Sequence, residues 1–210
     1  MKKQYLLFII IFLFSFKIHS QIIQGYGIKL GYVNSSQSFN NSLWDEDTKR
    51  KNGYSISAFI ALFNLSGFSI SPEVKYIQKG VGIEFIVTGE DSPEPIGTKT
   101  EYIYHNYLSI PISLMYKIQL EIGSPFFKAA PRYDILLKSS DDFKSPASTY
   151  DDYKNVFGGT ISIGFIPKFD SLIIPFIEFS YHIDFTYTYS NIFEKIKNNA
   201  FEINLGVLYY

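Results

Sequence analysis

The sequence contains no cysteine, only one tryptophan and only two methionines in 210 residues. The absence of cysteine excludes structural disulfides, thiolate metal sites and lipid attachment at a cysteine after signal cleavage. The chain also lacks an excess of positive or negative charge, because its formal net charge is −1. No nucleic acid and no strongly acidic partner is therefore expected. A mean hydropathy of only +0.03 argues against a helical membrane protein.

Aromatic residues are abundant. The chain has 20 Phe and 17 Tyr, and aromatic residues make up 18% of it. This excess suits the aromatic girdles with which transmembrane barrels contact lipid. The length corresponds to one domain.

The N-terminus has the pattern of a secretory signal peptide. Lys2 and Lys3 precede an apolar run over residues 5–16, and the small residue Ser20 precedes Gln21. A basic segment, a short apolar segment and a small residue at the cleavage position are typical of such peptides. The apolar run is too short to span a bilayer as a helix, although an uncleaved anchor is the alternative. We therefore predict a signal peptide over residues 1–20 and a mature domain over residues 21–210.

The clearest structural pattern extends from Ile173 to Tyr189. Apolar residues occupy the odd positions, and from Glu178 onward polar residues occupy the even positions. Strict alternation predicts a strand with one apolar and one polar face. At about 3.3 Å per residue and a tilt near 40°, this stretch would rise on the order of 40 Å, enough to cross a bilayer.

The same alternation recurs along the chain and predicts eight strands. They cover about residues 26–32, 54–63, 68–79, 102–118, 127–137, 156–166, 173–189 and 201–209. Long polar loops over 34–52, 80–101, 139–155 and 190–199 alternate with short turns. The phase fails at Gly80 and Gly82, which indicates a bulge or exit from the membrane. The pattern predicts an all-β fold: an eight-stranded antiparallel up-and-down transmembrane β-barrel of the Gram-negative outer membrane, with both termini periplasmic.

A soluble lipocalin-like barrel would show the same alternation with its apolar face turned inward. Side-chain size favours the membrane barrel. The polar face is rich in Gly and Ser, and the interior of eight strands has room for small side chains plus a few larger ones. The bulky Phe, Tyr, Ile and Leu set would overfill it. We therefore expect the apolar face to contact lipid and the lumen to be filled, with Phe59, Phe63 and Met115 among the inward residues.

Three segments resemble one family. FSISPEVKYIQKG (68–80), NYLSIPISLMYKI (106–118) and PFFKAAPRYDILL (125–137) are similar to the PorT-like outer-membrane barrels of the Bacteroidota. The resemblance covers most of the chain after the signal peptide. It implies the barrel fold, and it offers an accessory role in type IX protein secretion as an alternative function, since the family is named after a member implicated in that system.

Charged residues on the inward face are the candidates for chemistry. We expect them to form a structural network of ion pairs, because an unpaired charge in a narrow interior is costly. The predicted network consists of Lys29, Glu73, Lys75, Lys117, Lys128, Arg132, Asp134, Glu178, Asp184 and Glu202.

Three other site hypotheses are weaker. Ser180, His182 and Asp184 lie on one face of a strand, as a hydrolytic set would, but no oxyanion or nucleophile-elbow motif accompanies them. A metal site at His105 and His182 lacks further ligands at a recognisable spacing. Trp44, with Asp45, Glu46 and Asp47, could form a contact surface at a loop tip.

The sequence therefore predicts no catalytic residue, metal or cofactor. It favours a non-enzymatic barrel that acts through external loops or the periplasmic rim, in macromolecular interaction or envelope integrity. Expected partners are outer-membrane lipid, the barrel assembly machinery during biogenesis, and an envelope or secretion protein. The alternatives are a secretion accessory, a small-solute pore and an envelope-modifying enzyme.

Overall fold

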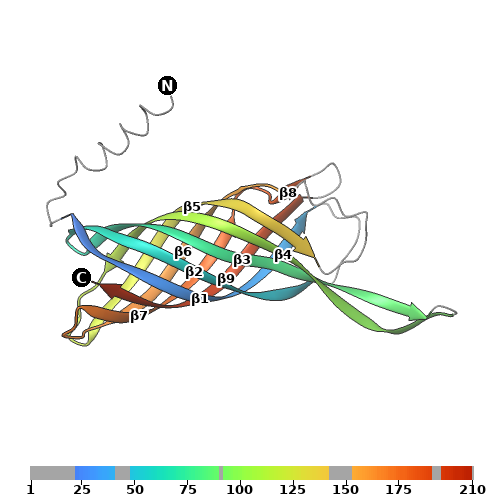
Figure 1. Ribbon diagram of the computed structural model, residues 1–210, viewed down its shortest axis with the longest axis horizontal. Helices are drawn as coiled ribbons and strands as arrows, with labels where there is room; N and C mark the ends of the chain where they lie inside the picture. The colour runs from blue at the N-terminus through green and yellow to red at the C-terminus, as the bar shows by residue number, and fades with distance from the viewer. Residues whose placement is uncertain (1–21, 41–47, 90–91, 142–152, 191–194, 210) are drawn as a thin grey trace, which may run out of the picture.

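The computed structural model describes residues 22–40, 48–89, 92–141, 153–190 and 195–209. These residues form nine β-strands (Figure 1). The strands are β1 (Ile23–Asn40), β2 (Thr48–Leu65), β3 (Phe68–Gly89), β4 (Ser92–Lys117), β5 (Gly123–Asp141), β6 (Val156–Pro167), β7 (Ile173–Asp184), β8 (Tyr189–Ser190) and β9 (Lys195–Tyr209). No described helix is long and apolar enough to span a bilayer. The predicted signal peptide, residues 1–20, lies outside the described residues.

The strands close into a barrel. Each pairs antiparallel with its neighbour in the order β1-β2-β3-β4-β5-β6-β7-β9, and β9 pairs with β1 to complete the ring. The short strand β8 pairs only with β9 and adds a small ribbon at one end. Eight strands therefore form the wall, which confirms the predicted fold class. A closed wall leaves no open sheet edge within the barrel itself.

Two of the predicted polar loops, 34–52 and 80–101, are largely strand. β1 continues to Asn40 and β2 begins at Thr48, so most of the segment 34–52 is paired. β3 and β4 pair through Gly89 and Ser92 and form a ribbon that extends far beyond the barrel (Figure 1). We call residues 84–101 the arm. The loop prediction for 80–101 was wrong because strands exposed to water on both faces have a polar, Gly- and Pro-rich composition and lose the alternation that marks a strand in lipid.

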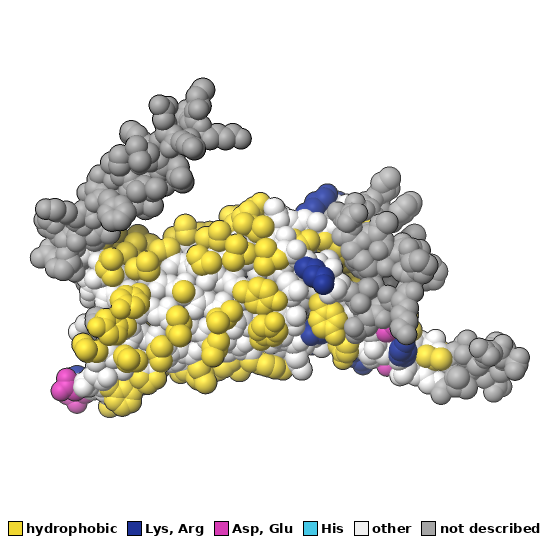
Figure 2. Space-filling model, viewed as in Figure 1, with side chains coloured by type: hydrophobic (Ala, Val, Ile, Leu, Met, Phe, Trp, Pro, Cys, Tyr) yellow, Lys and Arg dark blue, Asp and Glu magenta, His cyan; other side chains and the backbone are white. Residues whose placement is uncertain are grey.

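Apolar side chains cover the outer wall. On the face drawn in Figure 2 they form a belt across the barrel, with Lys and Arg gathered beyond the belt at the end that carries the arm. We call this end the long-loop end and the other the short-turn end. Outward aromatic pairs border the belt at both ends: Tyr26–Tyr209 and Phe68–Tyr116 at the short-turn end, and Tyr54–Tyr76, Tyr181–Phe201 and Phe157–Phe185 at the long-loop end. From Ile173 to Tyr181, strand geometry gives a height of about 20 to 25 Å, close to the apolar band of transmembrane barrels.

Inward glycines make room for inward aromatic rings. A Cβ at Gly164 would lie 2.2 Å from the ring of Phe126, and one at Gly206 would lie 2.5 Å from the ring of Phe176. Phe59 has the same relation to Gly27. The lumen thus holds three large rings only because glycine occupies the facing positions. Phe63, predicted to face inward, is exposed instead; it lies near the end of β2, and its φ is +56°.

The change of pattern near Gly80 marks the exit from the apolar belt. The register between β3 and β4 is continuous from Lys75 to Val87, so β3 has no bulge against β4 there. An irregularity lies instead in the pairing of β2 with β3, between Arg50 and Ser55. Beyond Tyr76 the inward positions of β3 become mainly apolar, with Ile77, Val81 and Ile83 buried. Outside lipid the wall faces water, so apolar residues are more stable inside.

Candidate functional site

The lumen is the candidate site predicted from the sequence, and at the short-turn end its floor is apolar. The floor consists of Phe59, Met115, Phe126, Ile166, Ile174, Phe176 and Leu208, all buried. The ring of Phe176 packs edge-on against Phe59 and Phe126, with centroids 5.7 and 6.3 Å apart. The Lys128 ammonium lies 4.9 Å from the Phe126 ring centroid, a distance at which a cation is attracted to the ring face. The floor therefore both closes the lumen and supports the first charged group above it.

A chain of ion pairs crosses the lumen above the floor. Glu178 accepts from Lys128 at 2.5 Å and from Lys29 at 3.0 Å, and Lys29 also donates to Glu73 at 2.7 Å. Lys75 continues the chain, 3.4 Å from Glu73 and 2.7 Å from Glu202. The three ammonium groups and three carboxylates come from five strands, β1, β3, β5, β7 and β9. We call this neutral set the lower group.

A second neutral set, the upper group, lies nearer the long-loop end. Arg132 donates to both Asp134 and Asp184, and Lys79 lies 2.8 Å from Asp134 and 3.6 Å from Asp184. Asp134 also accepts from Ser109 at 2.5 Å. Two cations thus face two anions. Because a buried charge without a partner is costly, the matching within each group favours one arrangement of side chains across the lumen.

Nine of the ten residues of the predicted network belong to these two groups. Lys117 does not: it lies at the short-turn end of β4, is only partly buried, and lines a small cavity beside the floor. Lys79 belongs to the upper group instead and is 1% exposed. The parity of β3 places Lys79 on the inward face, which was the available signal.

Polar and aromatic side chains close the lumen at the long-loop end. Gln37 lies 3.0 Å from both His105 and Asn198, and the His105 ring packs at a tilt against Tyr153 with centroids 4.4 Å apart. His105 lies beyond the aromatic girdle, three residues from the girdle level at Leu108, and it is fully buried. Burial lowers the pKa of His105 to about 3, so the imidazole is neutral at ordinary pH. This cap does not titrate in the physiological range.

The hydrolytic set proposed from the sequence is not assembled. Ser180 bonds to Ser162 at 2.9 Å and to Glu178 at 3.2 Å rather than to an imidazole. His182 bonds to Glu202 and Thr160, both at 2.8 Å, and Asp184 bonds to Arg132 and Asn198. Each side chain is used by a different part of the network, so none is available as nucleophile, base or orienting acid.

No group of three His, Cys, Asp or Glu side chains within the described ranges could hold a metal ion. His105 and His182, the two candidate ligands, belong to different groups of hydrogen-bonded residues, the cap and the lower group. Trp44 and the acidic residues 45–47 lie outside the described residues. Within the described lumen, nine of the ten predicted charged side chains form ion pairs with one another or with Lys79.

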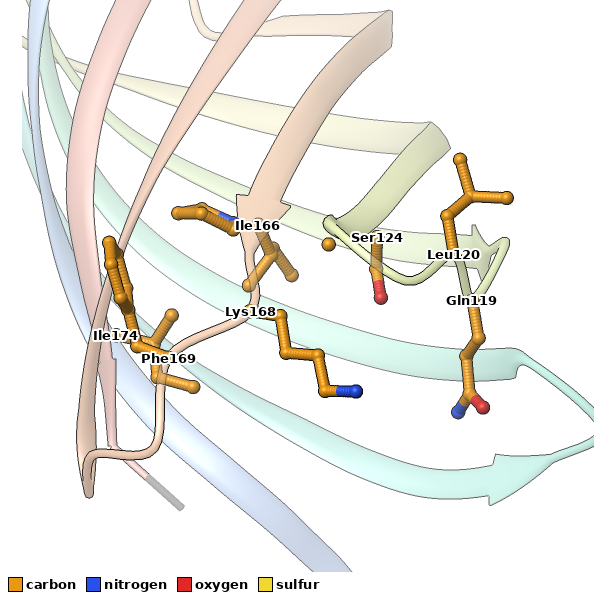
Figure 3. Close-up of a pocket in the computed structure, with 9 residues that line it drawn as sticks. Gln119, Leu120, Ser124, Ile166, Lys168, Phe169 and Ile174 are labelled. Carbon is orange, nitrogen blue, oxygen red and sulfur yellow. The ribbon is translucent and has the colours of Figure 1, made fainter.

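Little free space remains inside. A small cavity lies between the two charged groups and is lined by Glu73, Arg132 and His182 among others. Its volume of about 10 Å³ leaves room for about one water molecule. A wider hollow of about 250 Å³ lies at the rim of the short-turn end. There Lys168 and Phe169 of the β6–β7 connection face Gln119 and Leu120 of the β4–β5 connection (Figure 3). This hollow is open to the outside and separated from the ion pairs by the floor.

Comparison with known proteins agrees with this geometry. In the solved structures, the chain is similar to the outer membrane protein OprG from Pseudomonas aeruginosa, with a TM-score of 0.51 and 8% identity over 90% of this chain and 96% of that one. It is also similar to Neisserial surface protein A, with a TM-score of 0.47 and 12% identity over 88% of this chain and 96% of that one. No curated protein matches the sequence. At such low identities the likeness to OprG shows the fold alone.

The family comparison is more specific. Residues 20–206 match the family model described as outer membrane protein beta-barrel domain, which covers most of the chain. The outward apolar belt, the two aromatic girdles and the closed wall with an even number of strands are features of bacterial outer-membrane barrels. The chain therefore belongs to the outer membrane protein beta-barrel domain family and is an outer-membrane β-barrel protein.

Proposed function

We propose that this protein is a non-enzymatic outer-membrane barrel that acts through its long-loop end by binding other macromolecules. The observation that carries the proposal is the filled lumen. An apolar floor, two neutral groups of ion pairs and an uncharged cap occupy it in succession. Because the interior offers no room for a solute, the function lies on the surfaces that leave the membrane.

The arm supports an interaction role. It extends well beyond the belt (Figure 1), and between residues 84 and 101 its strands pair only with each other over most of their length. Phe85, Ile86 and Val87 are exposed on it, with Ile86 68% exposed. A ribbon with unpaired strand edges and exposed apolar side chains offers main-chain and side-chain contacts to an extended segment of a partner.

The proposal includes an orientation. We place the long-loop end outside the cell and both chain termini on the periplasmic side, because outer-membrane barrels combine short periplasmic turns with longer external connections. The three short connections, after β2, β4 and β6, lie together at one end, and the arm lies at the other. Protease added to intact cells is expected to cleave within the arm and to leave the short turns intact.

A closed lumen predicts that the purified barrel does not conduct ions. Folded protein inserted into a planar bilayer is expected to give no steady single-channel steps, because paired Lys, Arg, Glu and Asp side chains cross the lumen between two closed ends. The measurement is single-channel recording with protein whose folding is established by a heat-dependent gel shift. A conducting porin in the same bilayers is the positive control.

Reproducible unitary conductance from folded protein would contradict the closed lumen and favour a small-solute channel. A variant that lacks one lumenal charge provides a further check. If rare steps do occur, a variant such as Lys29→Met that weakens the lower group should make them more frequent. Steps that are identical in the variant would indicate leakage through the bilayer rather than through the lumen.

The sequence resemblance also suggests a more specific function. If the chain is a PorT-like barrel, it would have an accessory role in type IX secretion. The segment that carries much of this resemblance includes Glu73, Lys75 and Lys79, which form ion pairs in the lumen. These residues build the barrel, so the resemblance supports the fold more than a task. Crosslinking in cells followed by pull-down tests the role: recovery of secretion-channel subunits with the full chain, and their loss when residues 84–101 are replaced by a short turn, would support it.

A further inference from the structure

A groove on the lipid-facing wall carries an inference beyond the interaction role. It has a volume of about 450 Å³ and reaches from Phe127 on β5 across β6 and β7 to Phe201 on β9. Its walls are outward apolar side chains, among them Ile161, Ile163 and Phe179. The groove lies inside the apolar belt, so lipid acyl chains are the molecules that contact it in the membrane.

A fixed cation lies at the end of this groove. The Arg50 guanidinium lies 5.3 Å from the ring centroid of Phe201, the residue that closes the groove at the aromatic girdle. Arg50 reaches there across β1, and its Nε and Nη2 donate to the side-chain and main-chain oxygens of Asn34. Arginine has five N–H groups, so three remain for a ligand. Among the described residues Arg50 makes no ion pair, although it is exposed at the level where lipid head groups begin.

These two features match the two parts of an anionic lipid. Guanidinium binds phosphate through two parallel hydrogen bonds, and it does so better when its own position is already fixed. Basic residues at the edge of a lipid-facing surface recognise phosphorylated head groups by this chemistry. A second cation, Lys197, lies four residues from Phe201 along β9, about 13 Å away by strand geometry, within reach of a large head group.

We propose that the groove and Arg50 form a binding site for a phosphorylated, acylated lipid, with an acyl chain in the groove and a phosphate on the guanidinium. The acyl chain would lie over β5, β6, β7 and β9, and the head group would lie beyond the pair Tyr181–Phe201, toward Arg50 on β2. The site is independent of the lumen and of the arm. It would give the barrel a preferred lipid at one position of its circumference.

Native mass spectrometry of the detergent-solubilised full barrel tests the site with two probes, bisphosphorylated lipid A and the same lipid without its phosphates. The wild type is expected to retain the phosphorylated probe at least about tenfold better. Arg50→Gln is expected to lose this preference while keeping the weaker acyl-dependent binding. Lys138→Gln, which removes an exposed cation on β5 away from the groove, is the matched control and should keep the preference.

The groove is tested separately by filling it. Ile163→Trp is expected to weaken binding of both probes, whereas Ile70→Trp, at an outward position of β3 outside the groove, should not. The heat-dependent gel shift establishes that each variant is folded. Two results would overturn the site: a wild type that does not distinguish the probes, or Arg50→Gln and Lys138→Gln variants that lose the preference equally, which would indicate general attraction to a positive rim.

Discussion

Replacing Glu178 by glutamine is expected to lower the free energy of unfolding by about 3 to 5 kcal/mol. Glu178 is 2% exposed and binds both Lys29 and Lys128. Without its charge, three ammonium groups of the lower group would face two carboxylates in a lumen with almost no room for water. Removal of one partner of a buried pair leaves an uncompensated charge, and this is a larger effect than loss of the pair itself. Urea titration of the folded barrel in detergent micelles or vesicles, followed by gel shift, measures the change.

Two controls isolate the charge imbalance. Glu84→Gln makes the same chemical change in an exposed pair, where Glu84 lies 2.9 Å from Lys49, and it should have a much smaller effect because water screens the pair. The double variant Glu178→Leu with Lys128→Met leaves Lys29 and Lys75 facing Glu73 and Glu202, so the lower group is neutral again. It should recover most of the loss. A double variant as unstable as Glu178→Gln would show that packing, not charge balance, dominates this layer.

Replacing Leu205 by arginine is expected to cost about 2 to 4 kcal/mol, the effect of a cation on the lipid face near the midplane of a barrel. Leu205 is 64% exposed and lies midway along β9 between the girdle residues Tyr209 and Phe201. It pairs with Ile177 and Leu30, both outward and apolar. Folding into vesicles of phosphatidylcholine across a urea series gives the free energy, because the unfolded chain is then in water and the folded barrel in lipid.

Arginine at other depths in the membrane provides the comparison for Leu205→Arg. Phe179→Arg, one outward position from the girdle pair Tyr181–Phe201, should cost somewhat less than Leu205→Arg. Ile183, which the sequence pattern places on the lipid face, pairs with Asn199 beyond that girdle, so Ile183→Arg should cost only about 0 to 1 kcal/mol. Ser180→Ala, on the inward face, should also be mild. Equal costs at positions 205, 183 and 180 would contradict the placement of the belt.

The faces of the strands could be predicted from the sequence because side chains alternate strictly along a strand. Lipid outside and a narrow polar lumen inside sort residues by polarity and size, so parity alone separated Phe179 and Leu205 from Glu178 and Glu202. The same alternation predicted eight wall strands. It failed where lipid ends: in the arm and at the extended ends of β1 and β9, water contacts the outer face, and polar composition no longer distinguishes a paired strand from a loop.

The partners of the inward charges were decided only by the closed barrel. Parity says that Lys29 and Glu178 point inward, but not that residues 149 positions apart meet across the lumen. Lys117 and Lys79 both have the inward parity of their strands, yet height along the barrel places Lys117 beside the floor and Lys79 in the upper group. The groove on the outer wall and the position of Arg50 over Phe201 depend in the same way on which strands become neighbours. Alternation along a strand is local and is encoded in each strand separately, whereas the tilt and register that set height and neighbours exist only once all eight strands have closed.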